Sequence, residues 1–172
     1  MLKPLNIAFE KGLRLLSTHM PVSDENTRKP VFFHDVRVGV YLYENHYSRE
    51  IILAGLLHDT LEFSNITEQI LKDEFGETVL RLVQASTKDD SIQDKEEKTR
   101  ELIRRGVENG QDALIVKAAD ILDSFKFYTA TKNVGEIEYC MRNARAIFQF
   151  MPPEFNDKIF VELKGWMEKH PS

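Results

Sequence analysis

The sequence is poor in cysteine and in long hydrophobic runs. Cys140 is the single cysteine among 172 residues, which excludes an internal disulfide and a zinc site built on several cysteines. The longest apolar stretches, such as 51–57, are too short to cross a bilayer. Charged residues also interrupt the N-terminal segment, so it lacks the apolar part of a signal peptide. We therefore expect a cytoplasmic protein with no membrane partner.

Positive charge is also in short supply. The chain has 23 Lys and Arg residues against 28 Asp and Glu residues, for a formal net charge of −5. This balance gives no support for binding to a nucleic acid duplex, which requires a basic face. The hydrophobic share of 42% and the charged share of 30% are typical of a globular chain. The length predicts one domain over residues 1–172, and the oligomeric state stays open.

Patterns typical of strands are nearly absent, and the VFF segment before His34 is the one β-like run. Apolar residues instead recur at helical spacing, and capping residues, glycines and prolines separate the helices. The sequence therefore predicts an all-α bundle of about eight or nine helices. The expected helices are 5–19, 34–45, 48–63 with Ser48 as its N-cap, a helix from the N-cap Thr67 to Gly76, 77–86, a charged helix ending near Gly110, a long helix capped by Asp112, 135–150 and 155–169.

Two of these helices contain acidic side chains in their most apolar parts. His58 and Asp59 interrupt AGLLHDTLEF, and Asp120 interrupts LIVKAADILDSF. A buried ionised carboxylate is costly unless a cation or hydrogen-bond donors compensate its charge. For one such aspartate, a helix cap or a salt bridge would be enough to compensate the buried charge. For two in one small domain, a shared divalent metal ion is the better interpretation.

The spacing of the next acid supports a metal site. Glu62 follows His58 by four residues and Asp59 by three, which places all three on one side of a helix. Nitrogen and oxygen ligands without thiolate suit manganese, iron, cobalt, zinc or magnesium. A bound ion acidifies water, and Glu62 is expected to orient or deprotonate that water. Asp35 is expected to support the N-terminus of the helix that contains His34.

These residues resemble a known signature. His34, then His58-Asp59, then Asp120 is similar to the H…HD…D pattern of the HD-domain metal-dependent phosphohydrolases. The run 53–88 looks like the hydrolase domain of the RelA/SpoT-type (p)ppGpp pyrophosphohydrolases and their small single-domain relatives. The resemblance covers about residues 30–125, the core motif region of an HD domain on which helices in 135–169 are expected to pack. It includes Pro30, Phe75-Gly76, Leu82-Val83, Thr87-Lys88 and the VKAADILDSF segment.

The resemblance also implies roles for individual residues. The ligands of one divalent ion, manganese by resemblance, fall on His34, His58, Asp59 and Asp120. Glu62 falls on the first acid of the family's catalytic Glu-Asp pair, whereas Phe63 occupies the position of the second acid. Ser124 stands at the position of an asparagine and is expected to contact substrate. Arg28 and Lys29 are expected to bind substrate phosphate, as paired cations suit anionic oxygens.

Three functions follow as hypotheses. The first is a metal-dependent phosphohydrolase that acts on a nucleotide or another phosphorylated small molecule, with removal of the 3′ pyrophosphate of ppGpp as the implied reaction. The second is a degenerate HD module that binds a nucleotide or a partner without turnover, and the unusual residues Phe63 and Ser124 motivate it. The third is a helical scaffold without metal, which would leave two buried aspartates without a cation.

Overall fold

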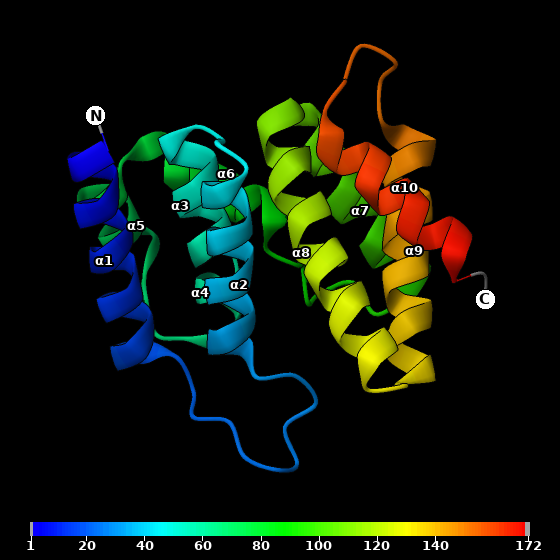
Figure 1. Ribbon diagram of the computed structural model, residues 1–172, viewed down its shortest axis with the longest axis horizontal. Coiled ribbons are helices and arrows are strands. Elements are labelled where there is room, and N and C mark those ends of the chain that lie inside the picture. The colour runs from blue at the N-terminus through cyan, green and yellow to red at the C-terminus, as the bar shows by residue number, and fades with distance from the viewer. Residues whose placement is uncertain (1, 171–172) are drawn as a thin grey trace. The chain divides into compact units, whose positions relative to one another are not determined.

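The computed structural model describes residues 2–170, and every regular element in that range is a helix. The all-α prediction is therefore confirmed. The described residues form ten helices rather than eight or nine, in part because a four-residue helix follows the interruption at His58 and Asp59. Figure 1 shows their arrangement. They are α1 Leu2–His19, α2 Val31–Glu44, α3 Arg49–Leu57, α4 Thr60–Phe63, α5 Glu68–Phe75, α6 Glu77–Ser86, α7 Lys95–Glu108, α8 Gln111–Ala130, α9 Val134–Phe150 and α10 Lys158–Lys169.

The chain forms two compact units, one up to Thr87 and the other from Lys88 onwards. The first unit contains α1 to α6 and the second contains α7 to α10. That residues 1–172 act as one domain stays a prediction. Among the described residues, no helix combines the length and the apolar character that a bilayer crossing requires.

The N-terminal unit is built around α3, whose residues 51–57 are all buried. Helix α2 packs closely against α3 because two glycines face the contact. A Cβ on Gly39 would lie 3.2 Å from the backbone Cα of Leu56, and a Cβ on Gly55 would collide with the Leu42 side chain. This close approach brings the first residues of α2 beside the residues that follow α3.

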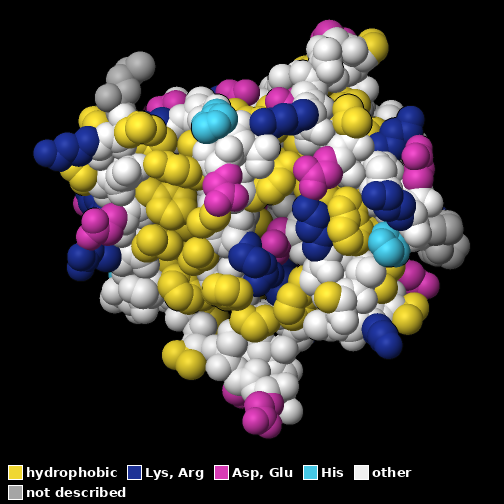
Figure 2. Space-filling model, viewed as in Figure 1, with side chains coloured by type: hydrophobic (Ala, Val, Ile, Leu, Met, Phe, Trp, Pro, Cys, Tyr) yellow, Lys and Arg dark blue, Asp and Glu magenta, His cyan; other side chains and the backbone are white. Residues whose placement is uncertain are grey.

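Helix α1 packs against both α2 and α3. The ring of Phe9 lies edge-on to that of Tyr43, with centroids 5.9 Å apart, and the Tyr43 hydroxyl donates to Asn6 Oδ1 at 2.7 Å. Figure 2 shows hydrophobic side chains gathered over α1 and α2 on the viewed face of this unit. On α1, the side chain of Ile7 is 58% exposed. Apolar residues therefore form part of this surface, in contrast to the polar groups enclosed at the ends of α2 and α3.

Several local predictions are confirmed. The hydroxyls of Ser48 and Thr67 accept hydrogen bonds from the backbone N–H groups of Ile51 and Ile70, as N-caps do. Gly76 ends α5 with a φ of 98°, a conformation that favours glycine.

Two other local predictions are wrong. The helix predicted over 34–45 begins three residues earlier, at Val31 directly after Pro30, so the VFF segment is helical. Asp112 is not an N-cap: Gly110, with a φ of 96°, precedes the first residue of α8, and Asp112 lies inside the first turn. A carboxylate in that turn favours the helix through the macrodipole rather than through a cap hydrogen bond.

In the C-terminal unit, α8 is the central helix. Its residues 113–122 are all buried, and α7, α9 and α10 pack against it. Most of these residues are aliphatic, but Lys117 and Asp120 are buried among them. The core of this unit thus contains two groups of opposite charge.

Candidate metal centre

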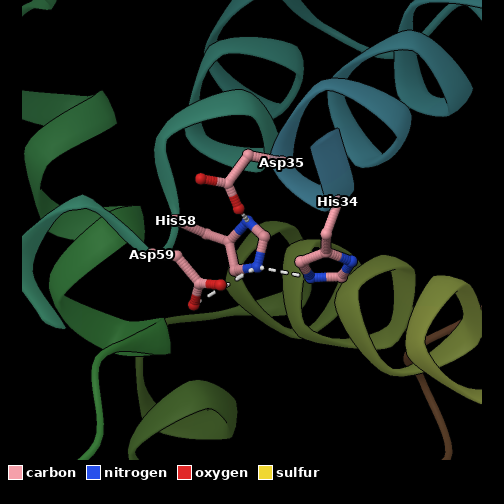
Figure 3. Close-up of side chains that lie close together, drawn as sticks. All are labelled: His34, Asp35, His58 and Asp59. Atoms are coloured by element: carbon pink, nitrogen blue, oxygen red, sulfur yellow. Dashed lines mark hydrogen bonds and ion pairs between the residues drawn. The ribbon is translucent and has the colours of Figure 1, made fainter. Parts of the chain in front are cut away.

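Four polar side chains of the N-terminal unit converge in its interior (Figure 3). His34 and Asp35 are fully buried, and His58 and Asp59 are 1% and 7% exposed. Each of the four side chains offers one ligand atom, and these four atoms all lie within 4.8 Å of one another. His34 and Asp35 belong to α2, and His58 and Asp59 lie between α3 and α4. The structure therefore brings together His34, His58 and Asp59, three of the four ligands that the sequence suggested.

The chain turns at this point because side chains bond to the last carbonyls of α3. The Thr60 hydroxyl donates to the Leu57 carbonyl at 2.6 Å, and His58 Nδ1 lies 2.8 Å from the Gly55 carbonyl. Such bonds compete with the backbone ladder of a helix. The prediction of one continuous helix over 48–63 is therefore wrong. His58 and Asp59 nevertheless keep right-handed helical dihedral angles, and α4 begins at the next residue, Thr60.

The two imidazoles meet through their Nε2 atoms, which lie 3.2 Å apart. Because the Gly55 carbonyl only accepts, Nδ1 of His58 carries the hydrogen and donates it. Nε2 of His58 then presents a lone pair, 3.6 Å from Asp59 Oδ1. Ring nitrogens and a carboxylate that face one point are ligands for a divalent transition metal. The donor set thus fits the ion that the sequence suggested.

Asp35 is a member of this cluster that sequence reasoning assigned to another role. Its Oδ1 lies 3.6 Å from His58 Nδ1, on the side of the ring away from Nε2 (Figure 3). Carboxylates in this position orient metal-binding histidines and raise their basicity. The predicted role at the helix N-terminus is wrong, because α2 begins at Val31 and Asp35 lies beyond its first turn. The sequence signal for a role of Asp35 in the cluster was its position directly after His34.

Glu62 lies on α4, half-buried, and its N–H donates to the Asp59 carbonyl at 3.2 Å. The backbone therefore holds Glu62 within one helical turn of Asp59. The next residue, Phe63, is 40% exposed. The structure thus has an apolar side chain at the surface where the family resemblance would place a second acid.

Asp120 belongs to the C-terminal unit, on α8, where it is 7% exposed. Its Oδ2 accepts from Lys117 Nζ at 2.8 Å, and its Oδ1 accepts from the Ser124 hydroxyl at 3.4 Å. Burial disfavours the charge of Lys117, yet the attraction of Asp120 outweighs it and raises the pKa of Lys117 above its ordinary value. Asp120 therefore has a buried ion-pair partner, and its role as a metal ligand stays a prediction.

Lys117 is the residue of this group that sequence reasoning missed. It stands three residues before Asp120 in an otherwise apolar helix, a spacing that places both on one side of α8. A lysine buried in such a helix requires an anion. The i, i+3 spacing was therefore the signal for a salt bridge.

Arg28 and Lys29 lie in the loop between α1 and α2, Arg28 exposed and Lys29 half-buried. The loop is shaped by Asp24, whose Oδ1 accepts from the Asn26 backbone N–H at 2.9 Å and from the Thr27 hydroxyl at 3.2 Å. The expected contact of Arg28 and Lys29 with substrate phosphate stays a prediction.

Comparisons with known proteins agree with the signature. The family model described as "HD domain" matches residues 13–149. A guanosine-3′,5′-bis(diphosphate) 3′-pyrophosphohydrolase from Aquifex aeolicus is 37% identical over 141 residues, which cover 70% of this chain and 20% of the relative. The Danio rerio protein named guanosine-3′,5′-bis(diphosphate) 3′-pyrophosphohydrolase MESH1 is 41% identical over 73 residues, 42% of this chain and 40% of the relative. The chain thus spans about a fifth of the length of the Aquifex protein.

The fold also has a solved counterpart. The structure described as a metazoan ortholog of SpoT that hydrolyses ppGpp superposes with a TM-score of 0.75, covering 94% of each chain at 20% identity. At that identity the likeness establishes the all-α fold and leaves the activity to be argued from the site.

Proposed function

Because this chain belongs to the HD domain family, we propose that it is a metal-dependent phosphohydrolase that removes the 3′ pyrophosphate of guanosine-3′,5′-bis(diphosphate), ppGpp. The observation that carries the proposal is the buried pair of Nε2 atoms, 3.2 Å apart, with Asp59 Oδ1 3.6 Å from one of them. The names of the Aquifex and Danio relatives support the choice of substrate.

In this proposal His34, His58 and Asp59 hold one divalent ion, and Asp120 supplies a fourth ligand. Manganese is the proposed ion, by resemblance to the family. A bound divalent ion polarises a phosphoryl oxygen and lowers the pKa of water. The buried surroundings of the three clustered residues favour tight binding, because little water competes for their ligand atoms.

The remaining residues act on the water and on the substrate. Glu62 orients the attacking water and accepts its proton on the carboxylate. The water oxygen bonds to the phosphorus next to the ribose 3′ oxygen, the bond from that phosphorus to the 3′ oxygen breaks, and the 3′ oxygen takes up a proton. Arg28 and Lys29 bind the phosphates, and Ser124 contacts the substrate from its position beside Asp120.

A second candidate function is binding of a nucleotide without turnover. Phe63 favours it, since a half-exposed phenylalanine cannot take or give a proton where the family resemblance places an acid. Under this alternative the metal site and the fold would be retained, and hydrolysis would not occur because the second carboxylate is missing.

The test is incubation of the purified chain with ppGpp and manganese, followed by chromatography for pyrophosphate and guanosine diphosphate. The proposal predicts equimolar release of both, abolished by a chelator. Binding of ppGpp by calorimetry without any release would favour the alternative. In that case Phe63→Asp, at an exposed position, is expected to introduce turnover.

Asp35→Asn is expected to weaken metal binding by about 10–100-fold, the range found when a group that orients a metal ligand is changed. The substitution keeps the size of the side chain and removes the negative charge 3.6 Å from His58 Nδ1. Calorimetric titration of manganese into metal-free protein measures the change. Asp73→Asn, at an exposed position on α5, is the control for loss of one negative charge. An unchanged affinity in Asp35→Asn would exclude an orienting role.

A further inference from the structure

The C-terminal unit contains a hollow between α7 and α9, which pack side by side (Figure 1). The cavity has a volume of about 230 Å³. This is below the range of pockets for drug-sized ligands, roughly 300–1,000 Å³. None of the residues proposed to bind metal or substrate lines it.

Helical spacing explains why the hollow exists. On α7, residues 96, 99 and 100 share one face, and on α9, residues 142, 145, 146 and 149 share another. The central residue on each face is short: Thr99 and Ala146 are 6% and 8% exposed. Longer polar side chains surround these two. The short residues form the floor and the long ones form the rim.

The rim is strongly cationic. It carries Arg100, Arg142 and Arg145 against one acid, Glu96. Nε of Arg142 donates to the Thr99 hydroxyl at 3.2 Å and lies 3.8 Å from Glu96 Oε1. Both contacts use Nε, one of the five N–H donors of a guanidinium. Arg142 is thus held in place on the rim of the hollow and retains donors for an anion.

The acid nearest to Arg100 offsets little of its charge. Arg100 lies 3.5 Å from Glu97, but the two side chains are 47% and 59% exposed, and such surface pairs are weak. Glu96 is 68% exposed. The guanidinium of Arg104 lies 4.8 Å from the ring centroid of Phe150, a lining residue, and adds a fourth cation beside the lining residues. Positive charge therefore gathers at this hollow in a chain whose formal net charge is −5.

We propose that this hollow is a second ligand site, which binds the diphosphate group of a small molecule. Guanidinium groups bind phosphate oxygens in a bidentate manner, and three of them around a small cavity match a compact anion with several oxygens. Free pyrophosphate and the diphosphate of a nucleotide share this chemistry. The site goes beyond the proposed hydrolysis, and its lining includes none of the residues proposed to react.

The test uses metal-free protein, so that binding at the metal centre does not contribute. Pyrophosphate, guanosine diphosphate and orthophosphate are titrated by calorimetry. The proposal predicts saturable binding of pyrophosphate or guanosine diphosphate, and weaker binding of orthophosphate. Tighter binding of pyrophosphate identifies the free anion as the ligand, and tighter binding of guanosine diphosphate identifies the nucleotide.

Three variants locate the binding. Arg145→Gln is expected to weaken the binding of the diphosphate by about tenfold or more, since a charge-assisted contact is lost. Glu96→Gln is expected to strengthen it, because the one acid on the rim loses its charge. Arg14→Gln, at an exposed position on α1, is the control for net charge and should change nothing.

Two results would overturn the proposal: no saturable binding to metal-free wild-type protein, or the same affinity in Arg145→Gln as in Arg14→Gln. Turnover of ppGpp is measured separately on the same variants with manganese. A variant that loses diphosphate binding and keeps turnover shows that the hollow is separate from the hydrolytic site. Absence of turnover in the wild-type protein contradicts the proposed function and leaves the proposal for the hollow unaffected.

Discussion

The variant His58→Ala is expected to show no hydrolysis of ppGpp and to bind manganese more than 100-fold more weakly than the wild-type chain. Loss of a group that only orients a ligand costs about 10–100-fold in affinity, and His58 is proposed to be a ligand itself. Its Nε2 lies 3.2 Å from Nε2 of His34 and 3.6 Å from Asp59 Oδ1. The His58→Ala substitution therefore removes the proposed ligand that lies close to both of the others. Calorimetry and pyrophosphate release measure the two effects.

The control for His58→Ala is His46→Asn. His46 is exposed and has a φ of 61°, a conformation that asparagine tolerates. This variant loses one imidazole and should keep full affinity and turnover. Because His58 is buried, Asp59→Asn serves as a second variant of nearly unchanged shape, for which weaker metal binding is also expected. Wild-type affinity for manganese in a folded His58→Ala protein would contradict the assignment.

The second large effect is expected at Asp120. Asp120→Ala should lower the free energy of unfolding by about 3–5 kcal/mol, the cost of removing one partner from a buried ion pair. It leaves Lys117, which is 3% exposed, without the carboxylate that lies 2.8 Å from its Nζ. Urea denaturation of metal-free protein isolates this effect from any contribution of metal binding.

The comparison for Asp120→Ala is an ion pair at the surface of the same unit. Lys126 Nζ lies 2.7 Å from Glu162 Oε1, but the two side chains are 37% and 38% exposed. Glu162→Ala should therefore cost no more than about 1 kcal/mol. An equal, small loss of unfolding free energy in both variants would show that the fold does not depend on the ion pair between Lys117 and Asp120.

A double variant separates the two roles considered for Asp120. Replacement of a buried ion pair by apolar residues of similar size is often neutral or stabilising, so Lys117→Met with Asp120→Leu should recover the stability that Asp120→Ala loses. If Asp120 is also a metal ligand, this stable protein still binds manganese weakly. Wild-type manganese affinity in the double variant would remove Asp120 from the proposed ligand set.

The fold class was predictable because it depends on residue spacing that is local in the sequence. Apolar periodicity predicted the helices, and the caps at Ser48 and Thr67 and the end of α5 at Gly76 follow from side-chain chemistry within a few residues. The start of α2 was harder to predict, because the VFF segment taken alone, with one β-branched and two aromatic residues, indicates a strand. Packing against α3 overrides that preference in the folded unit.

The site was predictable in its residue types and less so in its contacts. His58 and Asp59 stand out as polar residues in an apolar segment, and His34 was identified by resemblance to the family. Which side of the His58 ring Asp35 would meet depends on the crossing of α2 and α3, which depends on Gly39 and Gly55. Residue spacing along one helix contains no information about such a crossing.

The most direct test of the account is the metal content of the protein and its affinity for manganese. Elemental analysis of protein purified without added metal, followed by titration of chelator-treated protein with manganese, measures both. We expect one divalent ion per chain at saturation and loss of that binding in His58→Ala. A folded wild-type protein that neither contains nor takes up a divalent ion would contradict it.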